Sequence, residues 1–116
     1  MRDVAGIFAD IDALDPDAFV AHLAEDVVFR FGNGEPAVGR AAVRAGVAGF
    51  FSTIAGMKHQ VLNSFEVGDT VILQIDIDYT RHDGKTVTVP NADVLVFEGD
   101  LVKNWQIYID LAPVFA

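Results

Sequence analysis

The sequence predicts one α+β domain, residues 1–116, shaped as a cone of three N-terminal helices packed on a strongly curved antiparallel sheet. Its 116 residues correspond to one domain. Apolar residues recur at helical spacing as far as Ile54, and after Gly56 they recur at every second position. Helices followed by strands are typical of an α+β fold. A sheet of this kind can curl into a cone-shaped α+β barrel with one open end, which is a natural small-molecule cavity.

Three helices are predicted before the sheet. Apolar residues from Val4 to Leu14 lie on one stripe, with aspartates off that stripe, which indicates an amphipathic first helix. Asp15 and Pro16 then supply an N-cap and a first helical residue for a second helix, roughly Pro16 to Ala24. A glycine-rich loop from Phe31 to Gly39 precedes the third helix, Arg40 to Ile54.

Five strands are predicted, four of them in a meander. A short strand covers Val27 to Phe31. The meander strands, joined by turns that contain glycine and aspartate, are Met57 to Val67, Val71 to Arg81, Lys85 to Phe97 and Leu101 to Leu111. Because proline cannot donate to a strand ladder, a bulge is expected at Pro90.

Composition excludes several classes of function. A net charge of -9 and only eight scattered basic residues argue against nucleic acid and anionic membranes as partners. Without cysteine, disulfides and thiolate chemistry are excluded. The three histidines lack the spacing of a metal site, and no cofactor motif is found. With neither a signal peptide nor an apolar run of roughly 20 residues, a soluble cytoplasmic protein is expected.

Asp110 is the most informative single residue, because it stands in an otherwise apolar run near the end of the last strand. An ionised carboxylate costs several kcal/mol to bury without partners. Asp110 should therefore lie at a loop-like edge, accept hydrogen bonds, or have a raised pKa inside a pocket. The third alternative is the functional one.

Strand alternation gives two of the predicted strands one apolar face and one mixed face. In one interpretation the mixed faces, with Gln74, Asp76, Tyr108 and Asp110, are solvated. In the other, the apolar faces pack on another sheet or a second subunit, and the mixed faces line a pocket on which Asp76 and Asp110 converge. Apolar outer faces of this size would favour a sheet-to-sheet homodimer.

Four segments resemble the SnoaL-like branch of the nuclear-transport-factor-2-like superfamily, which includes ketosteroid isomerase, limonene-1,2-epoxide hydrolase and polyketide cyclases. These segments are LAEDVVF (23–29), EPAVGRAAV (35–43), VFEGDLVKNW (96–105) and IYIDLAPVF (107–115). Their order and spacing carry the resemblance, and together they span nearly the whole chain.

The resemblance implies roles for individual residues. Asp110 and Asp76 match the two aspartates of the epoxide-hydrolase branch. Gln74 replaces the arginine between them, and Phe29 and Phe31 replace the tyrosine and asparagine that hold the attacking water. That machinery is therefore incomplete. The ketosteroid-isomerase branch uses an aspartate base with tyrosine and protonated-aspartate donors, whereas the cyclase branch needs one aspartate on the last strand.

The expected function is a cofactor-independent isomerase, cyclase or hydrolase that acts by proton transfer on a small apolar molecule. The expected catalytic residues are Asp110, Asp76 and His59, and the expected substrate-binding residues are Tyr108, Gln74, Phe29, Phe31, Val94 and Val96. No metal is expected. Two alternatives remain: a non-catalytic module that binds a hydrophobic metabolite, and an interaction domain whose cavity is filled.

Overall fold

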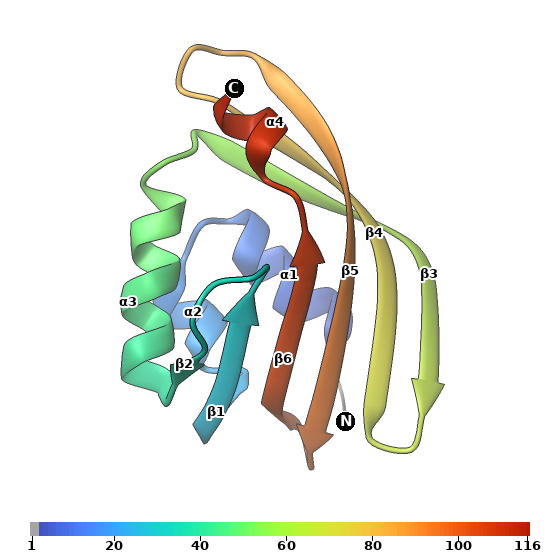
Figure 1. Cartoon of the computed structure of the whole chain (residues 1–116). Helices are drawn as coiled ribbons and strands as arrows, with labels where there is room; N and C mark the ends of the chain where they lie inside the picture. The colour runs from blue at the N-terminus through green and yellow to red at the C-terminus, as the bar shows by residue number, and fades with distance from the viewer. Residues whose placement is uncertain (1–2) are drawn as a thin grey trace.

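The computed structural model describes residues 3–116 and confirms the α+β fold, with a few helices on one face of a six-stranded mixed sheet (Figure 1). The elements are α1 (Val4–Asp12), α2 (Pro16–Val20), β1 (Leu23–Phe31), β2 (Ala37–Val38), α3 (Arg40–Phe51), β3 (Gly56–Val67), β4 (Thr70–Thr80), β5 (Thr86–Glu98), β6 (Leu101–Ile109) and α4 (Ala112–Phe115). The strand order is β2-β1-β6-β5-β4-β3, so the curved sheet does not close into a barrel.

The second helix is shorter than the sequence indicates. Asp15 Oδ1 accepts hydrogen bonds from the Asp17 and Ala18 amides, which caps α2 as expected. The helix nevertheless ends at Val20, because the chain already pairs with β6: Val102 N–H donates to the His22 carbonyl at 2.9 Å. The prediction that α2 reaches residue 24 is therefore wrong. β1 runs parallel to β6, whereas all other strand pairs are antiparallel.

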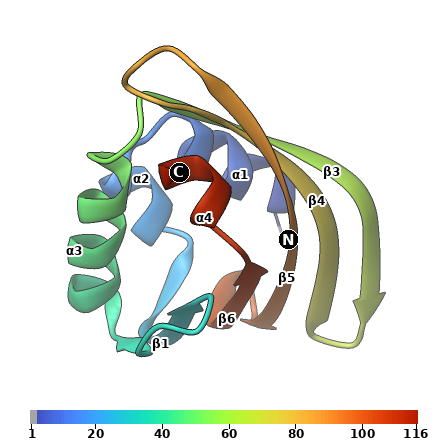
Figure 2. The same cartoon turned by 45° about the horizontal axis from the view of Figure 1, so that its top comes forward.

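The long hairpins follow the predicted meander, with two corrections. Pro90 lies opposite Asp76 in unbroken register, so the predicted bulge at Pro90 is wrong. Proline is tolerated there because the pairing of β5 with β6 starts only at Asn91. In addition, the chain leaves the sheet at Ile109 and ends in α4. Figure 2 shows α4 across the open end of the curved sheet, between α3 and β5.

The concave face of the sheet is its apolar face. Leu73, Ile75 and Ile77 on β4 are buried, as are Trp105 and Ile107 on β6, and they form one core with the apolar stripes of α1 and α3. The prediction that these faces pack outward on another sheet or subunit is wrong. They need apolar partners, and the helices that cover only this side of the sheet supply them (Figure 1).

Two leucine-to-alanine substitutions test this orientation. Leu73 on β4 is 0% exposed, whereas Leu62 on β3 is 57% exposed. We expect Leu73→Ala to lower the free energy of unfolding by about 2–5 kcal/mol, through lost burial and a cavity. The matched Leu62→Ala change should cost less than about 1 kcal/mol. Urea unfolding of both variants measures the difference, and equal losses would contradict the assigned faces.

Candidate functional site

A cavity of about 310 Å³ lies between the concave face of the sheet and the helices. This volume is near the lower end of the range for ligand pockets. The lining is aromatic and aliphatic, with a few polar groups: Phe8, Ile11, Phe19, Phe29, Phe31, Glu35, Ala37, Val43, Gly46, Val47, Phe50, Phe51, Met57, His59, Ile77, Tyr79, Asn91, Asp93, Trp105, Ile107 and Leu111. Glu35 and Gly46 are exposed, so the cavity reaches the surface between the β1–β2 loop and α3.

Asp93 on β5 is the buried carboxyl group of this cavity. It is only 1% exposed, and its Oδ1 accepts a hydrogen bond from Asn91 Nδ2 at 2.8 Å. Burial raises the pKa of Asp93 to about 6, since removal from water disfavours the carboxylate; Asn91, then His59 and Trp105, lower it. A carboxyl group with a pKa near neutrality can both accept and release protons at physiological pH.

His59 on β3 is held by Asp12, the last residue of α1. His59 Nδ1 lies 2.5 Å from Asp12 Oδ1, and the His59 backbone N–H donates to Asp12 Oδ2 at 3.0 Å. A carboxylate can only accept hydrogen bonds, so it assigns the proton to Nδ1 and leaves Nε2 for a ligand. The imidazole ring also packs on Phe8, with ring centroids 4.8 Å apart.

Three buried polar atoms of residues that line the cavity have no hydrogen-bond partner within residues 3–116: Tyr79 OH, Asn91 Oδ1 and Trp105 Nε1. Trp105 is near enough to lower the pKa of Asp93, although the two groups do not meet the geometry of a full hydrogen bond. Burial, followed by the charge of Asp93, raises the pKa of Tyr79, so its hydroxyl keeps its proton.

Of the residues predicted for the site, His59, Phe29 and Phe31 line this cavity. Gln74 and Asp76 do not, because they alternate with the buried residues of β4 and therefore lie on the convex face. Gln74 accepts a hydrogen bond from Asn63 there. Val94 and Val96, the predicted apolar walls, are half-buried on the same convex face, and neither lines the cavity.

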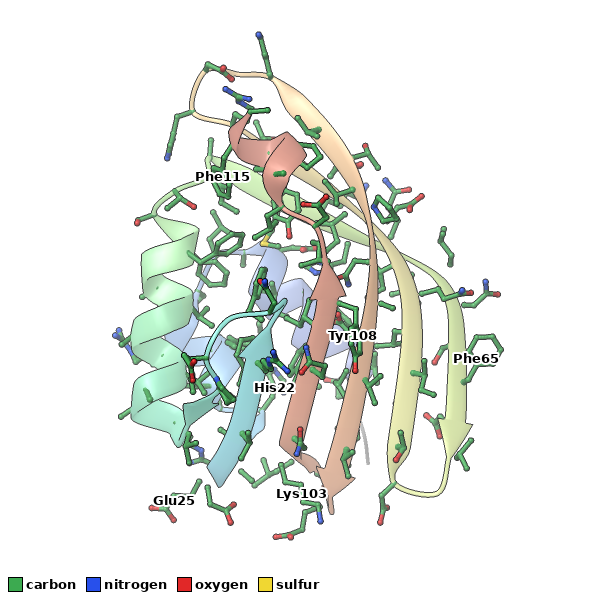
Figure 3. All side chains as sticks on the ribbon, in the orientation of Figure 1. His22, Glu25, Phe65, Lys103, Tyr108 and Phe115 are labelled. Atoms are coloured by element: carbon green, nitrogen blue, oxygen red, sulfur yellow. The ribbon has the colours of Figure 1, made fainter. Side chains whose placement is uncertain are left out.

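Asp110 and Tyr108 also lie outside the cavity. Asp110 is exposed, and its Oδ1 accepts a hydrogen bond from the Ala112 amide at 3.0 Å, at the start of α4. Tyr108 is 60% exposed on the convex face, away from the helices (Figure 3). The prediction that Asp76 and Asp110 face each other across a pocket is therefore wrong. Of the alternatives for Asp110, the structure shows the hydrogen-bonded edge position.

Sequence reasoning missed Asp93 and Asp12. Asn91, Asp93, Leu95 and Phe97 alternate with Ala92, Val94 and Val96, so both faces of β5 contain apolar residues. The available signal was a second aspartate inside an apolar strand, which has the feature that singled out Asp110. Asp12 carried no such signal, because its partner His59 lies 47 residues away along the chain.

Two classes of feature are absent from the described part of the chain. Within residues 3–116, no three His, Asp or Glu side chains are grouped so that they could hold a metal ion. Among the same residues, no helix has both the length and the apolar character needed to cross a membrane.

Comparisons with known proteins agree with this architecture. The family model of the SnoaL-like domain matches residues 4–105. A Catenulispora acidiphila protein with a ketosteroid isomerase-like fold, solved in complex with trimethylamine, is 20% identical, with a TM-score of 0.86 over 94% of this chain and 85% of that one. An LEH-like epoxide hydrolase from M. tuberculosis is 15% identical, with a TM-score of 0.80 over 97% of this chain and 83% of that one.

A third solved structure, from Jannaschia sp. CCS1 and named as a SnoaL-like polyketide cyclase, is 19% identical, with a TM-score of 0.82 over 97% of this chain and 85% of that one. No curated protein matches the sequence. At these identities, the solved structures support the fold and do not identify a reaction.

Asp93→Asn tests whether the buried carboxyl group is held at an energetic cost. The pKa of Asp93 is raised from 3.8 to about 6, so its favourable contribution to folding is complete below about pH 4 and is lost as the pH rises through 6. Relative to wild type, we therefore expect the variant to gain stability between pH 4 and pH 7, by up to about 3 kcal/mol. Denaturant unfolding at pH 4, 6 and 8 measures this difference.

The exposed Asp110 provides the matched control, since Asp110→Asn removes a carboxylate that is not buried. A pH-independent loss of stability in Asp93→Asn would contradict the raised pKa.

Proposed function

Because the chain belongs to the family of SnoaL-like domains, and because Asp93 and His59 line one apolar cavity, we propose that it is a proton-transfer enzyme acting on a small apolar molecule. It would be an isomerase, cyclase or hydrolase that needs no cofactor, since carboxylate and imidazole suffice for general acid–base catalysis. The reaction takes place in the concave cavity, and Asp110 and Asp76 have no part in it.

The observation that carries this proposal is the buried Asp93, with a pKa of about 6, in the same cavity as the His59–Asp12 pair. A structural role would be served better by an apolar residue, since burying a carboxyl group costs free energy. Perturbed titratable groups that gather in a cavity are typical of active sites. Near neutral pH, Asp93 is largely ionised and acts as the base that removes a proton from carbon.

His59 complements Asp93 as the second proton-transfer group. Asp12 holds its Nδ1 and stabilises the imidazolium that forms when Nε2 takes a proton. An isomerisation or a carbon–carbon ring closure needs a proton removed at one atom and supplied at another, and two separate groups meet that need. In a hydrolysis, the same imidazole would activate a water molecule.

The aromatic walls set the character of the substrate. Phe29 and Phe31 line the cavity. The epoxide-hydrolase branch, which the sequence resembles, has water-holding polar residues at the matching positions. This favours ring closure or isomerisation over the addition of water. The replacement of those polar residues by phenylalanine also favours the alternative of a non-catalytic binding module. A filled cavity is less compatible with the observed volume of about 310 Å³.

Hydrogen–deuterium exchange of 2-tetralone tests the proposed chemistry. This neutral bicyclic ketone has acidic protons next to its carbonyl group, so an enzyme with a positioned base should accelerate their exchange in D2O. We expect Asp93→Asn and His59→Asn each to slow the protein-catalysed exchange by about 100-fold or more. Proton NMR follows the reaction.

Asp76→Asn and Asp110→Asn are the matched controls, because both aspartates lie outside the cavity. We expect wild-type exchange rates from both. If calorimetry shows that 2-tetralone binds while its exchange is not accelerated, the protein is a binding module and the catalytic proposal fails. If Asp110→Asn removes the activity, Asp93 is not the base.

We also propose that a second copy of the chain covers the convex face of the sheet. Phe65, Ile72 and Val94 stand opposite one another on β3, β4 and β5, and form one apolar row across that face. Phe65 is 52% exposed and projects away from the helices (Figure 3). Polar amides flank the row at Gln74 and Gln106, so the face can pair with its own copy through apolar packing and amide hydrogen bonds.

Ile72→Asp should convert this homodimer into a monomer, because two unpaired carboxylates would be buried where the copies meet. Light scattering at micromolar concentration measures the mass, which falls from twice 12.5 kDa to 12.5 kDa. Val38→Asp, at a 64% exposed valine on β2, is the control and should remain dimeric. A wild-type protein that is monomeric under these conditions refutes the interface.

A further inference from the structure

The place where the cavity reaches the surface carries a carboxylate that the proposed reaction does not use. Glu35 lies in the loop between β1 and β2, which crosses from the sheet towards α3 (Figure 1), and it lines the cavity although it is exposed. Among residues 3–116, no side chain forms an ion pair with Glu35. No lysine or arginine of the same range lines the cavity. A ligand that enters here therefore meets a negative charge with no competing cation.

The arginines that flank Glu35 along the chain have other partners. Arg30 Nε donates a hydrogen bond to the Gly34 carbonyl at 3.0 Å, which fixes the loop beside Glu35. Arg40, at the start of α3, donates from Nε to the Leu23 carbonyl at 2.7 Å. The loop is thus held in place without the Glu35 side chain, so that its carboxylate is available to a ligand at little cost in ordering.

Two half-buried aromatic rings accompany this carboxylate. Phe31 is the last residue of β1, directly before the loop that carries Glu35, and Phe50 lies on α3 one helical turn after Gly46. The ring centroids of Phe31 and Phe50 are 5.2 Å apart, and both rings line the cavity. Aromatic faces attract organic cations, and they do so without needing hydrogen bonds from the ligand. We call Phe31, Glu35, Gly46 and Phe50 the mouth of the cavity.

Gly46 keeps the mouth open. A β-carbon added at Gly46 would meet no other atom within 4 Å, so close packing does not require glycine at this position. Glycine inside a helix is less favourable than alanine. Because Gly46 is exposed and lines the cavity, a larger side chain there would occupy the space in front of Glu35 and Phe50.

We propose that the mouth is a head-group site for an organic cation, a protonated tertiary amine or a quaternary ammonium group, whose apolar body fills the cavity behind it. Glu35 supplies the opposite charge and the rings of Phe31 and Phe50 supply cation–π attraction. The net charge of -9 also draws cations towards the protein. This inference deepens the proposed function, from which it takes the cavity as the ligand site, because it names the substrate class. The buried Asp93 stays available for a proton of the apolar body.

Two compounds of the same shape test the need for charge. Phenyltrimethylammonium and tert-butylbenzene differ only in a nitrogen cation in place of a carbon atom. Trp105 is the sole tryptophan of the chain and lines the cavity, so its fluorescence reports the binding of both compounds. We expect the cation to bind about three- to tenfold tighter than the hydrocarbon. Equal affinities, or tighter binding of tert-butylbenzene, overturn the proposal.

Glu35→Gln localises the preference, because it removes the charge and keeps the shape of the side chain. We expect this variant to bind phenyltrimethylammonium about three- to tenfold more weakly, with tert-butylbenzene unchanged. Glu25→Gln, at an exposed glutamate that does not line the cavity, removes the same net charge and should bind both compounds like wild type. A preference that survives Glu35→Gln but is lost in Asp93→Asn places the cation at the buried carboxyl group and refutes the head-group site.

Gly46→Leu tests the position of the mouth, and Gly49→Leu is its matched control. Both glycines lie on α3 and an added β-carbon meets no atom within 4 Å at either, but of the two only Gly46 lines the cavity. We expect Gly46→Leu to weaken the binding of phenyltrimethylammonium about tenfold or more, and Gly49→Leu to leave it unchanged. Thermal melts should show both variants folded, since leucine favours a helix over glycine. Wild-type affinity in Gly46→Leu refutes the mouth.

The outcome is separable from that of the proposed function. A preference for the cation without exchange of 2-tetralone keeps the head-group site and rejects the catalysis. Exchange of 2-tetralone without a preference for the cation keeps the catalysis and rejects the head-group site.

Discussion

Alternation of side chains along β4 and β5, and along β6 from Trp105 onward, is the constraint on which the rest of the structure depends. Successive residues of a strand point to opposite faces, so the choice of one buried face assigns every other residue of the strand. Helices cover only the concave side of this sheet (Figure 1). Asp93 is therefore placed inside by the same rule that places Asp76 and Tyr108 outside. A shift by one residue would exchange the two sets.

This constraint explains why the site has an energetic cost. Asp93 occupies an inward position next to Leu95 and opposite Leu73, where any apolar residue would fit the pattern. Within residues 3–116, its carboxyl group accepts a hydrogen bond of good geometry from Asn91, and that bond does not replace the hydration lost on burial. The raised pKa of Asp93 follows directly from this loss of hydration. Local conflicts between sequence and fold are expected where function requires them.

The sequence alone predicted the fold because two periodicities meet at Gly56, and each follows from backbone geometry. It did not predict where α2 ends or that the chain finishes in α4, since both depend on contacts between distant segments. The end of α2 is decided by the pairing of His22 with Val102. Of the residues predicted for the site, His59, Phe29 and Phe31 line the cavity, and their roles are proposals.

Asp93 was not predicted because alternation cannot by itself say which face is covered. β5 has Val94 and Val96 on one face, and Leu95 and Phe97 on the other, so both faces satisfied the requirement for burial. The two aspartates that match the epoxide-hydrolase branch, Asp76 and Asp110, both lie outside the cavity. Matched residue types along a chain do not establish matched positions in space.

The Asp12–His59 pair joins the two layers of the molecule and its proposed chemistry. Asp12 ends α1, and its carboxylate accepts hydrogen bonds from both the backbone and the ring of His59 on β3. The backbone bond docks the helix on the edge strand, and the ring bond orients the imidazole toward the cavity. The docking of α1 therefore completes the cavity wall, through Phe8 and Ile11, and at the same time sets the tautomer of His59. Because one carboxylate does both, the acid–base pair exists only when the helix layer is in place, and the proposed activity is tied to the integrity of that contact.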